Sequence, residues 1–87
     1  MKPGEDIVNQ GLEDLALQLE TIPALLVLIG APRLRRLGLK IPETTIGSPE
    51  HRLYEVLRAD NPDAAHSRYN ALIRRLVSYE RAAECGI

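Results

Sequence analysis

Residues 62–83, PDAAHSRYNALIRRLVSYERAA, decide the fold of this chain. Hydrophobic side chains recur in this stretch at intervals of 4-3-4-3-4, and the recurring set is Ala65, Tyr69, Leu72, Leu76, Tyr79 and Ala83. This period places all of them on one side of a single α-helix. At 1.5 Å per residue, such a helix is about 33 Å long. A compact chain of this length has a radius of gyration of about 12 Å, so we expect the helix to cross the whole molecule.

The composition also favours helices. The chain has 87 residues, which is the size of one domain, and 45% of them are hydrophobic. It contains no Phe or Trp and only three Tyr, so Leu must form most of the core. Leu-rich cores suit packed helices better than β-sandwiches, which favour aromatic and β-branched residues. We therefore predict a single all-α domain over residues 1–87, a small bundle of four or five helices with a long C-terminal helix.

The remaining helices are predicted from apolar spacing and from start and stop signals. We expect helices over residues 5–20, 21–29 and 33–39, and two more that begin at the motifs Ser48-Pro49-Glu50 and Asn61-Pro62-Asp63. In each motif the first residue, Ser48 or Asn61, is the expected helix cap. The first should bury Val8, Leu12, Leu15 and Leu19. The second, capped by Thr21, carries an apolar run without a polar side and should be the central element. Residues 38–48 contain two Gly and one Pro and should form an irregular loop.

The hydrophobic side of the C-terminal helix allows two interpretations. In a heptad frame its residues take the a and d positions, and Arg75 would face Glu80 of a second chain in a parallel pair. Alternatively, Ile73 and Val77 widen the stripe, as in a helix that packs on several neighbours inside one chain. The first interpretation predicts a homodimer, with a candidate interface formed by Tyr69, Leu72, Ile73, Leu76 and Tyr79.

A basic segment is the strongest candidate for a ligand site. Residues 33–40 carry a formal charge of +4, whereas residues 1–24 carry −4. On a continuous helix Arg33, Arg36 and Lys40 share one side, which would suit an anion such as a nucleic-acid phosphate. No aromatic residue lies among them to stack on a base. The other interpretation is that these cations pair with the acidic first helix or stay solvated.

Residues suited to catalysis are few. His51 and His66 have no Cys or acid at a metal-ligand spacing, and we expect them to pair with Glu55 and Asn70 one helical turn away. Cys85 is the only cysteine, so no disulfide forms within the chain. The sequence predicts no catalytic residue, no metal site and no cofactor.

These observations predict a non-enzymatic helical interaction module that self-associates or serves as an accessory or adaptor subunit. The alternative is a nucleic-acid- or anion-binding protein that uses residues 33–40. The longest apolar run, residues 22–31, contains Pro23 and is too short to cross a bilayer. Glu5 and Asp6 stand where a signal peptide would carry basic residues, so we expect a cytoplasmic protein.

Overall fold

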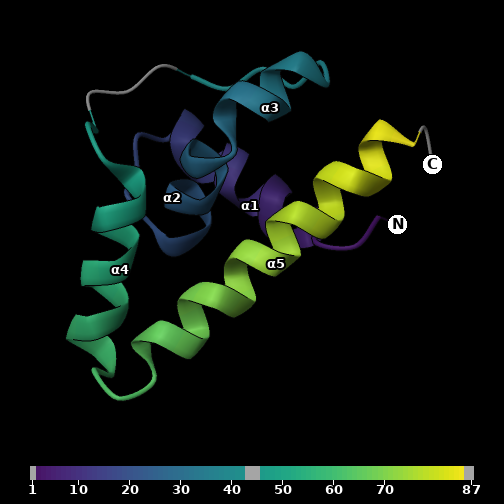
Figure 1. Cartoon of the computed structure of the whole chain (residues 1–87). Helices are drawn as coiled ribbons and strands as arrows, with labels where there is room; N and C mark the ends of the chain where they lie inside the picture. Colours follow the sequence, from purple (N-terminus) through teal and green to yellow (C-terminus); the bar gives the residue numbers. More distant parts are fainter. Residues whose placement is uncertain (1, 43–45, 86–87) are drawn as a thin grey trace.

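The computed structural model describes residues 2–42 and 46–85, and these residues form helices and connections without a strand. In chain order the helices are α1 (Glu5–Ala16), α2 (Ile22–Ile29), α3 (Ala31–Arg36), α4 (Pro49–Asp60) and α5 (Ala65–Glu84). The prediction of an all-α bundle with a long C-terminal helix is confirmed. Figure 1 shows α5 running the length of the molecule, with α4 beside its start and α2 and α3 above it. The radius of gyration is 12.5 Å, and the longest dimension is 37 Å.

Helix α5 is unbroken over its 20 residues, as predicted, but it begins three residues after Pro62. The Asn61 side chain accepts hydrogen bonds from the backbone N–H groups of Asp63 (3.1 Å) and Ala64 (3.3 Å). Asn61 therefore caps a turn over residues 61–64 that precedes the α-helix, and the prediction that it caps the helix itself is wrong. Ala65 is fully buried, which fixes the start of α5 against the core.

Helix α2 is the central element, as its apolar run predicts. Ala24, Leu25, Leu26 and Val27 are fully buried, and α2 contacts each of the other four helices. The predicted cap is also present, since the Thr21 hydroxyl accepts a hydrogen bond from the N–H of Ala24 at 3.2 Å.

Helix α1 ends at Ala16, so the prediction of a helix up to Glu20 is wrong. Gln18 adopts a left-handed backbone conformation with φ of 60°, and the N–H of Leu19 donates to the carbonyl of Asp14 at 2.8 Å. The buried Asp14 carboxylate also accepts a hydrogen bond from the Thr21 hydroxyl at 2.6 Å. These bonds turn the chain towards α2, and Leu19 is exposed instead of joining the apolar line of α1.

The α1–α2 pair packs closely because Gly11 lies at the crossing. A Cβ atom at this position would lie 2.4 Å from the carbonyl oxygen of Pro23 and 2.5 Å from Cγ2 of Val27. Both distances are well below van der Waals contact, so only glycine permits this approach.

Helix α3 is a separate short helix, as predicted, but it spans Ala31–Arg36 rather than residues 33–39. Gly38 has a φ of 97°, and the N–H of Leu39 turns back to the carbonyl of Leu34 at 3.1 Å. A glycine in the left-handed region with such a bond is a common helix terminator. Lys40 therefore lies outside the helix, and it does not share a helix side with Arg33 and Arg36.

The loop predicted near residues 38–48 separates α3 from α4. Its residues 43–45 lie outside the described residues. Ser48, predicted as the cap of α4, makes no capping side-chain hydrogen bond. None of the helices in the described part is long and apolar enough to span a membrane.

Candidate interaction surface

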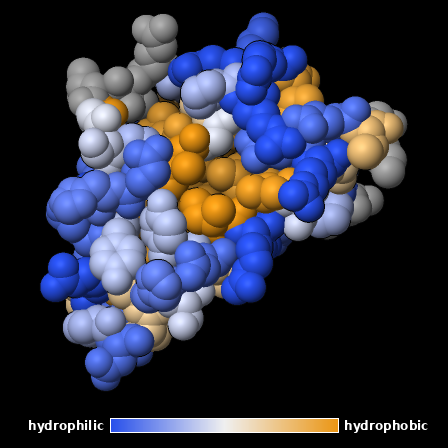
Figure 2. All heavy atoms as spheres, viewed as in Figure 1, coloured by the Kyte–Doolittle hydropathy of each residue, from blue (hydrophilic) through white to orange (hydrophobic). Residues whose placement is uncertain are grey.

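An apolar groove of about 300 Å³ lies between the α2–α3 corner and the second half of α5. We call it the α2–α5 groove, and its lining residues are Ile29, Gly30, Pro32, Arg33, Arg36, Ile73, Leu76, Val77 and Glu80. The α5 residues of this set are spaced by three or four positions, so they share one side of the helix. Figure 2 shows hydrophobic atoms gathered between α2 and α5 on this face, surrounded by hydrophilic residues. A concave apolar patch with a polar rim is typical of an interaction surface.

The floor of the groove is closely packed at Gly30. A Cβ atom there would lie 3.0 Å from Cδ1 of Leu76 and 3.1 Å from Oε2 of Glu80. Leu76 itself is only 3% exposed. Val77 and Ile73 are half-buried, so they offer apolar surface to the groove without being part of the buried core.

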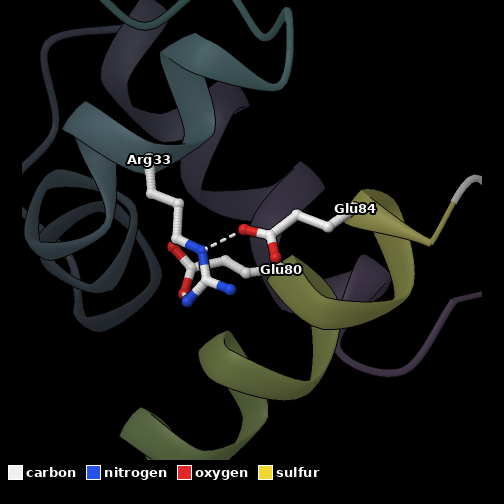
Figure 3. Close-up of polar contacts among 3 residues, drawn as sticks. All are labelled: Arg33, Glu80 and Glu84. Carbon is white, nitrogen blue, oxygen red and sulfur yellow. Dashed lines mark hydrogen bonds and ion pairs between the residues drawn. The ribbon is translucent and has the colours of Figure 1, made fainter.

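Arg33 ties α3 to α5 at the rim of the groove. Its Nε donates to Glu84 at 2.5 Å, and its Nη1 donates to Glu80 at 3.3 Å. Figure 3 shows the guanidinium group of Arg33 reaching from α3 to both carboxylates on α5. The sequence interpretation in which this arginine pairs with the acidic first helix is wrong for Arg33, since its partners lie on α5.

The pKa values of the two glutamates in this cluster shift in opposite directions. Burial raises the pKa of Glu80, which is 4% exposed, although the charge of Arg33 acts in the opposite direction. The pKa of the exposed Glu84 is lowered because Arg33 donates a hydrogen bond to its carboxylate. The contact with Glu84 in turn raises the pKa of Arg33. The contact with Glu84 therefore stabilises the charged form of Arg33. For the Glu80 carboxylate, the cost of burial exceeds the favourable attraction to Arg33.

The three predicted anion-binding residues are not gathered at one site. Arg33 and Arg36 line the α2–α5 groove, and Lys40 lines another hollow together with Arg35. Arg33 is engaged by two carboxylates, whereas Arg36 is exposed and makes no ion pair with any described residue. Anion binding by Arg33, Arg36 and Lys40 stays a prediction from the sequence. Since Arg33 is paired with Glu80 and Glu84, Arg36 and Lys40 are the members of this set that have no ion pair among the described residues.

The predicted interface residues of α5 divide into two groups. Leu76 and Tyr79 are buried within the chain, whereas Tyr69, Leu72 and Ile73 are half-buried. Tyr69 packs edge-on against Tyr54 of α4 with ring centroids 5.9 Å apart, and burial raises its pKa. Burial likewise raises the pKa of Tyr79. Only Ile73 and Leu76 of the predicted set line the groove.

Arg75 and Glu80, which form the interchain pair of the heptad frame, each have an ion-pair partner within the chain. Arg75 donates to both carboxylate oxygens of Asp6 on α1, at 2.9 and 3.0 Å, and this contact lowers the pKa of Asp6. Glu80 is bound by Arg33. The stripe of α5 therefore packs on the core of its own chain at Leu76 and Tyr79, while Ile73 and Val77 along its flank are half-buried.

The described residues contain no group of three or more His, Cys, Asp or Glu that could hold a metal ion. His51 pairs with Glu55 at 2.5 Å, and His66 contacts Asn70 at 3.2 Å, as the helical spacing predicts. Cys85 is an exposed free thiol. Neither histidine lines the groove.

The sequence interpretation missed several groove residues. The predicted interface omits Val77, although Val77 widens the stripe of α5, and it contains no residue of the α2–α3 corner such as Ile29 or Pro32. The i, i+3, i+4, i+7 spacing of Ile73, Leu76, Val77 and Glu80 was the available signal. No family model, no curated protein and no solved structure matches this chain.

Proposed function

We propose that this protein is a non-enzymatic helical interaction module that self-associates through the α2–α5 groove. The observation that carries the proposal is the half-buried apolar surface of Ile29, Ile73 and Val77 in a concave site. Covering such a surface removes apolar area from water, and this favours association in proportion to the area covered.

The small size of the groove implies weak association. A stable interface buries about 1,200–2,000 Å² in total, counted over both partners. A groove of about 300 Å³ provides only part of this area. We therefore expect a concentration-dependent equilibrium with dissociation constants of about 10 µM to about 1 mM rather than a permanent oligomer.

Val77→Glu tests the proposal with little effect on the fold, because Val77 is half-buried and lines the groove. The deeply buried Leu76 would be a poor choice, since Leu76→Glu should unfold the chain whatever the role of the groove. Ser78→Glu is the matched control, because Ser78 is the next residue on α5, is exposed and does not line the groove.

The readout is the weight-average mass by sedimentation equilibrium over about 10 µM to about 1 mM. The native chain and Ser78→Glu should both exceed the monomer mass of 9.7 kDa as concentration rises, and Val77→Glu should stay monomeric with an unchanged far-UV circular dichroism spectrum. A native chain that is monomeric over the whole range would refute self-association. Equal association of Val77→Glu and the native chain would show that the groove is not the contact surface.

A further inference from the structure

Leu17 and Leu19 are the large hydrophobic side chains that the described part of the chain leaves exposed, at 70% and 47%. They lie in the connection between α1 and α2, and we call residues 17–19 the Leu17–Leu19 turn. The two leucines are separated by one residue, so this turn exposes two large apolar side chains close together in the chain.

The turn is fixed by its backbone hydrogen bonds. The N–H of Leu17 donates to the carbonyls of Glu13 and Asp14, at 3.2 Å each, and the N–H of Gln18 donates to Leu15 at 3.0 Å. The N–H of Leu19 donates to Asp14, whose buried carboxylate is held by Thr21. A turn that is already ordered loses little conformational entropy when it binds.

The charges around the two surfaces are complementary. Residues 13–20 carry a formal charge of −3, but Asp14 is buried and Glu20 pairs with Arg52, so Glu13 is the exposed acid of this segment without an ion pair among the described residues. The residues that line the groove carry +1, from Arg33 and Arg36 against Glu80. Glu13 is exposed near the turn, and Arg36 is exposed at the groove without an ion pair among the described residues. Opposite charges at the rims favour and orient such an encounter.

Both surfaces are available on one copy at the same time, because they share no residue. Glu20 ties the end of the connection to Arg52 of α4, whereas the groove is built from α2, α3 and α5. We propose that the Leu17–Leu19 turn of one copy docks into the α2–α5 groove of a second copy. This inference rests on the proposed function, because it names the part of the second chain that enters the groove.

A mixing experiment tests this pairing. The turn variant is Leu17→Glu combined with Leu19→Glu, and the groove variant is Val77→Glu. Asn9→Glu is the control for added charge on α1, since Asn9 is exposed and lies outside the turn. The turn variant and the groove variant, each alone, should associate at least about tenfold more weakly than the native chain, whereas Asn9→Glu should associate like the native chain. An equimolar mixture should recover association, because one variant keeps an intact groove and the other an intact turn.

The outcomes separate the two proposals. If the turn variant associates like the native chain while Val77→Glu is monomeric, the groove is used but the turn is not its occupant. The same conclusion follows if the mixture fails to recover association. If the native chain itself is monomeric up to about 1 mM, the proposed function fails as well. Leu17→Glu alone replaces the double variant if thermal unfolding shows that two new charges disturb the fold.

Discussion

Gly11→Ala should destabilise the protein, although alanine is the better helix former. Ala is favoured over Gly inside a helix by about 1 kcal/mol, so secondary-structure propensity alone predicts stabilisation. In the structure, however, the new methyl group would lie 2.4 Å from the Pro23 carbonyl oxygen and 2.5 Å from Cγ2 of Val27. Ordinary contacts begin near 3.4 Å, so α1 must move away from α2 by roughly 1 Å.

The size of the effect follows from these opposing terms. Forced overpacking of a well-packed core costs about 1–3 kcal/mol, and the upper part of this range applies because a backbone carbonyl blocks the site. After subtraction of the propensity gain, we expect a net loss of about 1–2 kcal/mol. A domain of this size loses about 4–8 °C in melting temperature for each kcal/mol, so the midpoint should fall by about 4–16 °C.

Thermal and urea unfolding followed by circular dichroism would measure both quantities. Gly47→Ala is the control, because among the described residues no heavy atom beyond Gly47 and its two chain neighbours lies within 4 Å of a Cβ placed at Gly47. Its stability should remain within about 0.5 kcal/mol of the native value. A Gly11→Ala variant as stable as the native chain, or more stable, would refute the argument that close approach at Gly11 sets the spacing of α1 and α2.

Two further predictions concern backbone strain and pH. Gln18→Gly should stabilise the fold by about 0.5–1 kcal/mol in urea unfolding, because Gln18 is held at a φ of 60°, which glycine adopts more readily. Gln18→Ala is the control and should not increase stability, since alanine is as unsuited to this conformation as glutamine. Burial raises the pKa of Glu80, so the Glu80 carboxyl stays protonated to higher pH in the folded protein than in the unfolded chain. The stability linked to this proton is therefore present at low pH and is lost as pH rises through the raised pKa. The unfolding free energy of Glu80→Gln relative to the native protein should therefore increase from about pH 4 to about pH 7, and a decrease would show that attraction to Arg33 outweighs burial.

The sequence predicts those parts of the fold that depend on local chemistry. The period of residues 65–83 gives an unbroken α5, and the apolar run of residues 24–27 gives the buried centre. The Thr21 cap is also recovered, because it depends on a side chain three residues from its partner. Each of these signals is contained within one or two helical turns, where spacing alone determines which residues meet.

The remaining features depend on contacts between distant segments. Arg75 and Asp6 are 69 positions apart, and Arg33 lies 47 and 51 positions from Glu80 and Glu84. No periodicity within one helix identifies such partners. The groove could not be predicted for the same reason, because it exists only where the α2–α3 corner and α5 leave space between them.

Helix α1 ends at Ala16, four residues before the predicted end at Glu20, and the residues that follow form the proposed docking surface. Because the chain leaves the helix at Ala16, Leu17 and Leu19 point to solvent, and each forgoes part of the roughly 1.5–3 kcal/mol that full burial of a leucine would contribute. Gln18 adds the cost of a left-handed conformation. Folding alone gives no reason to retain two exposed leucines on such a turn. If docking into the α2–α5 groove is the reason, polar substitutions at Leu17 and Leu19 should leave the monomer at least as stable as the native chain while they remove self-association. A loss of stability in the same variants, at concentrations where the native chain is monomeric, would mean that these leucines stabilise the fold itself.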